Sequence, residues 1–182
     1  MARLPYLDLK DLAPEHHDLL ARKINLNKLL AHSPEAARAF GKLGGHIRFK
    51  SKLDPRLREL AILQVGYLTK SEYEYSHHVK IGFDFGVTGD DVRAIAVETA
   101  GHASNLEPFA KTVLKAAREM TQDLSISDAT FAALRERLSE AELVDLVLTI
   151  GFYNGVVRVL DTLKIDVEPE YAKYLDEFPL PK

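Results

Sequence analysis

The chain has 182 residues, of which 46% are hydrophobic and 28% charged, a composition typical of one globular domain rather than of a disordered or fibrous protein. Its 24 Lys and Arg are scattered among 27 Asp and Glu, for a formal net charge of -3, which argues against nucleic acid as a partner. The chain contains no cysteine, so disulfides, thiolate nucleophiles and thiolate metal sites are excluded.

The sequence favours a cytoplasmic address. No apolar run approaches the ~20 residues that a membrane span needs. The first 20 residues lack the charged and then apolar pattern of a signal peptide. We therefore expect neither a membrane nor a nucleic acid as a partner.

Helix start signals recur along the chain. Ser33 and Pro34 form one, as a cap followed by proline at the first helical position, and Asp54 with Pro55 repeats the device. Between them, the pair Gly44 and Gly45 predicts an interruption or an end of the first of these helices. Later, Gly86 is expected to end a helix that begins near residue 72.

Further helix starts carry the reciprocal capping-box spacing of a Ser or Thr followed three residues later by an acidic residue. The last of them precedes an apolar three- and four-residue period that predicts a long core helix from about Glu140 to Leu163. Strand signals are nearly absent, so we predict an all-helical (all-α) fold in a single domain over residues 1–182. The four capping boxes are Ser71/Glu74, Thr88/Asp91, Ser104/Glu107 and Ser139/Glu142.

Two weaker features concern the organisation of the domain. The tail over 168–182 has three prolines and little periodicity, which predicts an extended C-terminal arm. The segment 57–68 with its following Tyr/His-bearing stretch is echoed by 143–160, as a duplicated helix-hairpin unit would produce. Amphipathic helices share a period in any case, so the echo alone is weak.

The richest polar stretch runs from residue 56 to residue 82. On the helix that begins near Ser71, Glu74 and His78 are four residues apart and therefore lie on one face. Glu59, on the preceding helix, can face them across a helix hairpin. A carboxylate beside an imidazole is common equipment for proton transfer, and burial of Glu59 would push the pKa of its carboxyl upward.

Structural interpretations of the same residues stay open. Glu74 can be only the second half of a capping box with Ser71. A histidine such as His78 is more often a satisfied core or surface residue than a catalyst, and Glu59 alone is most often a solvated helix residue. Tyr73, Tyr75 and His77 have the same ambiguity, since aromatic residues at helical spacing are usually core.

Two carboxylate–imidazole pairs are candidate metal ligands. Glu74 with His77 reproduces the Glu-x-x-His step of di-iron bundles, and Glu98 with His102 forms a second carboxylate–imidazole pair. A di-iron site uses two Glu-x-x-His steps and two further Glu residues. Only one Glu-x-x-His step is evident in this sequence. We therefore predict no metal and no cofactor.

At this stretch the sequence resembles the carboxymuconolactone decarboxylase family, which includes the alkyl hydroperoxidase D-like proteins. The family core is a Glu in an Arg-x-Arg-Glu-Leu helix, followed in the redox branch by a Cys-x-x-Cys-x-x-x-His segment. Residues 56–60 match the first part, and residues 71–78 match the second. Position by position, Glu59 matches the family glutamate, Ser71 the first cysteine, Glu74 the second cysteine and His78 the histidine.

The resemblance covers most of the chain. It implies an alkyl hydroperoxidase D-like helical fold, a homo-oligomer such as a dimer, trimer or hexamer, and a pocket near the subunit interface. In the redox branch the two thiols act at a helix N-terminus. Serine and glutamate cannot replace them in that chemistry.

We therefore expect a cofactor-free enzyme that acts on a small organic acid or lactone by proton transfer, a lyase with decarboxylation as the model reaction. In this hypothesis His78 is the general acid or base, Glu74 orients it and Glu59 supplies the second proton-transfer group. The candidate substrate-binding residues are Tyr73, His77 and Ser71. The alternatives are a peroxiredoxin-type redox protein, which the absence of cysteine disfavours, and a non-catalytic binding or assembly protein on the same scaffold.

Overall fold

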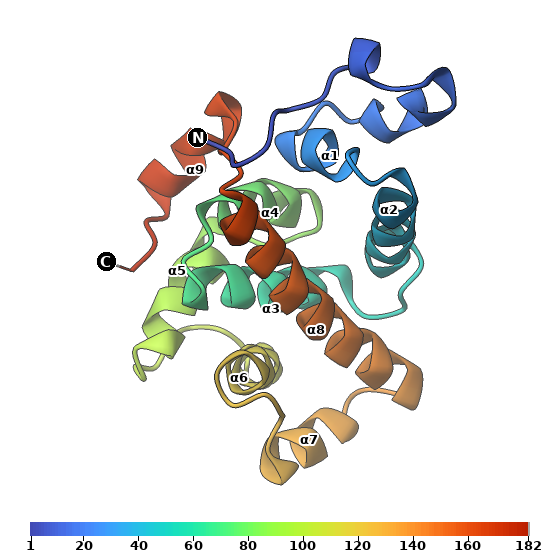
Figure 1. The fold of residues 1–182 in the computed structure, drawn as a ribbon. Coiled ribbons are helices and arrows are strands. Elements are labelled where there is room, and N and C mark those ends of the chain that lie inside the picture. The colour runs from blue at the N-terminus through green and yellow to red at the C-terminus, as the bar shows by residue number, and fades with distance from the viewer. Residues whose placement is uncertain (182) are drawn as a thin grey trace.

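The computed structural model describes residues 1–181, and within them it contains helices and no strand (Figure 1). Two short 3-10 helices, Leu9–Asp11 and Pro14–Leu20, precede the α-helices. The α-helices are α1 (Asn25–Leu30), α2 (Pro34–Phe49), α3 (Pro55–Leu68), α4 (Glu72–Asp84), α5 (Gly89–Thr99), α6 (Pro108–Gln122), α7 (Asp128–Arg135), α8 (Glu140–Leu163) and α9 (Pro169–Glu177). The predicted all-α fold is confirmed.

Helix α3 forms the centre of the molecule. Every side chain from Arg58 to Val65 is buried, so the helix has no solvent face over two turns. It packs against α4, α5, α6 and α8, and α8 crosses it obliquely (Figure 1). A polar residue on α3 must therefore find its partner inside the protein, since water does not reach it.

Several predicted helix starts are confirmed. The side chain of Asp54 accepts a hydrogen bond from the Leu57 N–H, and the Thr88/Asp91 and Ser139/Glu142 pairs form reciprocal capping boxes. The predicted Ser104/Glu107 box is wrong. Helix α6 begins instead at Pro108 with Glu107 as its N-cap, and the hydroxyl of Ser104 donates to Glu98 at 2.6 Å.

The two predictions about helix-ending glycines have opposite outcomes. Gly86 has φ +93°, a conformation that favours glycine, and it follows the end of α4 as predicted. The pair Gly44 and Gly45 neither interrupts nor ends α2, which continues to Phe49. The intrinsic cost of glycine in a helix, about 1 kcal/mol per residue, is too small to break a helix of 16 residues that packs on its neighbours.

The C-terminal segment corrects a further prediction. Of the predicted arm over 168–182, residue 182 lies outside the described residues, and most of the rest is not extended but helical, as α9. Glu168 occupies the N-cap position and Pro169 the first helical position, a start signal that resembles the one at Ser33. Helix α9 packs on α4, and Phe178 just beyond it is buried.

Helix α8 bears on two expectations. It runs without a break from Glu140 to Leu163, as predicted, so the second half of the internal echo is one straight helix rather than a hairpin. Within residues 1–181 it is the one helix long and apolar enough to suit a membrane span. The core helix of a globular protein passes the same test, and one face of α8 is buried against α3 and α6.

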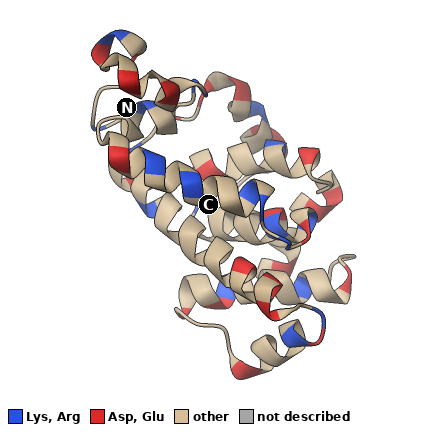
Figure 2. Cartoon of the chain, turned by 90° about the vertical axis from the view of Figure 1, so that its right-hand side faces the viewer, with Lys and Arg blue, Asp and Glu red and all other residues tan. Residues whose placement is uncertain are grey.

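Acidic and basic residues alternate along the helices rather than gathering on one element (Figure 2). Many of them form ion pairs with charged residues of other helices or loops, as Arg56 does with Asp91 and Glu107. Within residues 1–181 the helices therefore carry mixed charge, in contrast to the clustered Lys and Arg typical of a surface that binds a nucleic-acid backbone.

Candidate active site

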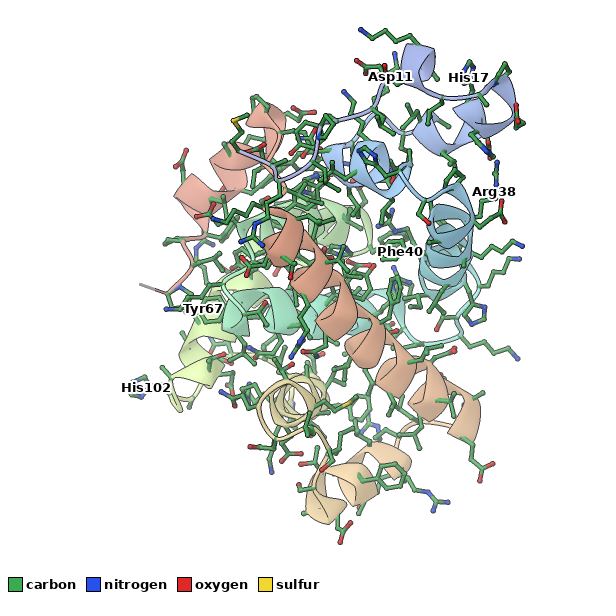
Figure 3. All side chains as sticks on the ribbon, in the orientation of Figure 1. Asp11, His17, Arg38, Phe40, Tyr67 and His102 are labelled. Carbon is green, nitrogen blue, oxygen red and sulfur yellow. The ribbon has the colours of Figure 1, made fainter. Side chains whose placement is uncertain are left out.

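A pocket of about 300 Å³ lies between α2, α4, α8 and the segment that leads into α1. Aromatic side chains form much of its wall, and Phe40 points from α2 toward the interior of the molecule (Figure 3). Glu74 and His78, one turn apart on α4, bring the buried polar groups to this wall. The aromatic members of the wall are Phe40, Phe49, Tyr73, Phe152 and Tyr153.

Glu59 and His78 form a buried pair, as their predicted placement across a helix hairpin requires. The Nδ1 of His78 lies 2.6 Å from Oε2 of Glu59, and the two side chains are almost fully excluded from solvent. Because a carboxylate can only accept, Nδ1 carries the proton in this contact. Arg58 donates from both Nε and Nη2 to the other oxygen of Glu59, at 3.0 and 2.9 Å.

Glu74 lies on the opposite side of the same imidazole. Its Oε1 is 2.9 Å from Nε2 of His78, but the two groups are not aligned for a hydrogen bond. Among the residues that the structure describes, this buried oxygen has no hydrogen-bond partner at all. Ser71 makes no side-chain cap to α4. Glu74 therefore does not serve as half of a capping box, and its carboxylate is instead the ion-pair partner of His78 at the wall of the pocket.

The two carboxylates decide the charge of His78. Burial alone would lower the pKa of this imidazole, but the negative charges of Glu74 and Glu59 outweigh burial and raise the pKa to about 9. His78 is therefore an imidazolium at neutral pH, with Nδ1–H directed to Glu59 and Nε2–H next to Glu74. A cation of this kind is a general acid before it is a base.

The behaviour of Glu59 differs from the sequence-based prediction. Burial pushes the pKa of its carboxyl upward, as predicted, but the neighbouring His78 and Arg58 reverse the shift, so that the pKa lies below its usual value. Glu59 is ionised, fully buried and absent from the pocket wall. Glu59 thus fixes and charges His78, while Glu74 is the carboxylate that faces the pocket, which exchanges the two roles predicted from the sequence.

Tyr153 adds a hydroxyl to the same wall. Its ring stands edge-on to the ring of His78, with centroids 4.9 Å apart. Burial raises the pKa of this phenol, and the charges of Glu74 and Glu59 raise it further. The hydroxyl therefore stays protonated and is able to donate a hydrogen bond to an oxygen of a bound molecule.

The predicted substrate-binding residues divide into two groups. Tyr73 and His77 line the pocket, but their polar atoms serve the fold: the Tyr73 hydroxyl accepts from the Leu26 N–H and donates to Glu168. Nδ1 of His77 donates to the Tyr73 carbonyl at 2.8 Å, and its ring is stacked between two tyrosines. Ser71 lies outside this pocket, at the start of α4.

The candidate metal ligands are dispersed in the described part of the chain. No group of three or more His, Asp or Glu within residues 1–181 is arranged to hold a metal ion. The Glu98 and His102 pair does not form, because Glu98 bonds to Ser104 and Lys111 while His102 points away from the molecule (Figure 3).

Sequence reasoning missed three residues of the site. The sequence motif contains Arg58 but gives it no role, and no motif includes Arg48 or Tyr153. A signal for Arg48 exists, since Gly41, Gly44, Gly45 and Arg48 follow the i, i+3, i+4, i+7 spacing of one helix face. Tyr153 comes from a helix more than 70 residues further along the chain, and no local pattern links it to His78.

The fold and site together define a helical protein with a buried imidazole between two carboxylates at the wall of an aromatic pocket. Residues 34–118 match the model of the carboxymuconolactone decarboxylase family, and this match confirms the resemblance predicted from the sequence. Over these residues the chain is similar to that family, and its sequence contains no cysteine. No curated protein sequence matches it significantly.

Solved structures agree on the fold. A peroxidase-related protein of uncharacterised function from Ralstonia eutropha JMP134, described as an alkylhydroperoxidase AhpD core, has a TM-score of 0.81 at 20% identity, covering 100% of this chain and 98% of its own. A cysteine-to-alanine variant of the debrominase Bmp8, bound to 2,3,4-tribromopyrrole, has a TM-score of 0.83 at 17% identity, covering 98% of this chain and 100% of its own. A putative antioxidant defence protein AhpD from Agrobacterium tumefaciens has a TM-score of 0.66 at 19% identity, covering 77% and 95%. At these identities the likeness establishes the AhpD-like fold.

Proposed function

We propose that this protein is a cofactor-free lyase that protonates carbon during decarboxylation of a small organic acid or lactone. The observation that carries the proposal is the charged His78 at the pocket wall, paired with Glu59 behind it and Glu74 beside it. A proton donor that is charged at neutral pH and held in a fixed orientation suits the protonation of a carbanion or enolate.

The reaction proceeds in two steps. A substrate carboxylate next to an unsaturated carbonyl system loses CO₂, and the two electrons of the broken C–C bond move into the carbonyl to form an enolate. The Tyr153 hydroxyl donates a hydrogen bond to that oxygen. His78 then gives its Nε2 proton to the carbon that lost CO₂, and the imidazole recovers a proton from water while Glu74 and Glu59 hold it in the charged state.

Thiol redox chemistry is the second candidate, because some structural neighbours are described as peroxidase-related. It requires a sulfur that passes through a sulfenic acid, and the chain has no cysteine. A non-catalytic binding protein is the third. The fixed and charged His78 favours the enzyme over both alternatives.

A substrate screen tests the proposal. We expect turnover of at least one member of a panel of β-keto acids, unsaturated lactone acids and ring carboxylates, followed as CO₂ release in the presence of a metal chelator. The same preparation should not reduce alkyl hydroperoxides with a thiol donor above a protein-free blank. Peroxide turnover that survives chelation, or CO₂ release that His78→Gln leaves unchanged, would rule the proposal out.

A further inference from the structure

The wall of the pocket opposite His78 is built from α2, and its composition is unusual for a helix. Gly41, Gly44, Gly45 and Arg48 all line the pocket, at positions that lie on one helix face. Every glycine in a helix interior destabilises the helix relative to alanine. Three of them on the face that borders the pocket give that face almost no side-chain volume.

The space left by these glycines is open. A Cβ built at Gly41 or at Gly45 would meet no atom within 4 Å, and one at Gly44 would rest against the Phe152 ring at 3.8 Å. Close packing between helices therefore does not require glycine at these positions. The three glycines instead leave open space along this side of the pocket, with the aromatic rings of Phe40 and Phe152 beside it. We call the surface of Gly41, Gly44 and Gly45 the glycine floor.

Arg48 stands at the end of this floor without a carboxylate partner. Its guanidinium forms no ion pair with any residue of the described chain, whereas the neighbouring Arg56 and Arg58 are both paired. Arg58 holds the Arg48 backbone by donating to its carbonyl at 3.1 Å. The Arg48 side chain lies close enough to the Tyr153 hydroxyl to oppose the rise of its pKa. A half-buried arginine without an ion pair is a site for an anion.

A second observation, independent of the glycines, points to a ligand in the same pocket. Glu74 is 4% exposed and lines the pocket, and its Oε1, although 2.9 Å from Nε2 of His78, is not aligned for a hydrogen bond to it or to any other group within residues 1–181. Unsatisfied buried polar atoms in folded proteins call for a specific explanation, of which a missing ligand is one. This carboxylate and the guanidinium of Arg48, which has no ion pair within the described chain, border one cavity.

We propose that the glycine face of α2 and the guanidinium of Arg48 bind a flat, ring-containing carboxylate, with the ring on the glycine floor and the carboxylate on Arg48. Arg48 is thereby the residue that selects an anionic substrate and sets the orientation in which the ring meets His78. The inference rests on the proposed function for the position of the reacting carbon. The binding itself needs neither His78 nor Glu74 to be active.

Isothermal titration with benzoate and its neutral analogue benzamide tests the charge selection. The wild-type protein should bind benzoate at least about tenfold more tightly than benzamide, since a charge-assisted pair with a guanidinium contributes this much. Arg48→Gln should abolish the preference. Lys42→Gln removes the same charge from an exposed position of the same helix and should retain it.

Gly45 provides a test that does not depend on charge. Gly45→Ala should keep benzoate binding and raise the melting temperature by a few degrees, because alanine is the better helix former. Gly45→Leu should fold as stably as the wild type and lose binding of both probes at least tenfold, because its side chain fills the floor. Loss of affinity without loss of stability is an outcome that damage to the fold does not produce.

Three results would overturn the proposal: no benzoate binding to the wild-type protein, a preference for benzoate that survives Arg48→Gln, or unchanged binding in Gly45→Leu. The Glu74→Gln protein separates this proposal from the proposed function. It should bind benzoate with near wild-type affinity whether or not the wild-type protein turns over any substrate.

Discussion

Glu74→Gln should fold with a lowered melting temperature and lose about 10²-fold or more in kcat/KM, a typical loss for a disrupted general acid–base pair. The amide is isosteric with the carboxylate but carries no charge, so it no longer supports the imidazolium of His78. The melting temperature should fall because the buried ion pair with His78 is lost, and not because of a helix cap, since Glu74 makes no capping-box contact to Ser71. Melting curves and steady-state kinetics on the substrate found by the screen check both parts.

Glu72 provides the matched control for this variant. It lies in the same first turn of α4 but is exposed to solvent. Glu72→Gln removes the same charge from the same helix end and should leave kcat/KM within about twofold of the wild-type value, because it touches neither His78 nor the pocket. Full activity in Glu74→Gln would leave His78 with Glu59 as the only acid–base pair.

Arg58→Ala should have the largest effect on stability, a loss of about 3–5 kcal/mol in the free energy of unfolding. Arg58 is 2% exposed and supplies two hydrogen bonds to Glu59. Its removal leaves a buried carboxylate with one cationic neighbour instead of two, and it also frees the backbone carbonyl of Arg48. Urea denaturation followed by circular dichroism measures the loss.

Two controls assign this loss to the buried charge. Arg56→Ala, two residues earlier on α3, breaks pairs that are partly exposed and should cost at most about 1 kcal/mol for each pair. The double variant Arg58→Ala/Glu59→Gln should recover part of the loss, because it no longer buries an under-compensated carboxylate. A double variant less stable than Arg58→Ala alone would mean that packing of the guanidinium, rather than its charge, dominates.

The sequence predicted the secondary structure well where local signals agree with packing. The capping boxes at Thr88 and Ser139 and the long apolar period of α8 formed as predicted, and the Arg56 guanidinium donates to Asp91 without displacing it from its box. At Ser71 the same spacing was misleading. The carboxylate of Glu74 pairs with His78 one turn later, a partner that the capping pattern does not take into account.

The roles within the site depended on information that no local pattern contains. The sequence placed Glu59 opposite His78 correctly, but it gave no indication that Arg58, the adjacent residue on the same helix, turns back to hold the carboxylate. Together with the larger effect of His78, that contact lowers the pKa of Glu59 against the effect of burial. The low helix propensity of Gly44 and Gly45 predicts a helix break, but the pair lies within a continuous α2 and borders the pocket, which the sequence does not show.

Nuclear magnetic resonance of the ¹⁵N-labelled His78 side chain, assigned with the His78→Gln protein, measures the protonation of the imidazole directly. We predict that both ring nitrogens carry protons at pH 7 and that the ring loses one only as the pH rises through about 9, since Glu74 and Glu59 raise the pKa above its ordinary value of 6.5. In Glu74→Gln the midpoint should move to lower pH. A neutral His78 at pH 7 in the wild-type protein, with a midpoint at or below 6.5, would contradict the claim that this pocket holds a proton ready for transfer to carbon.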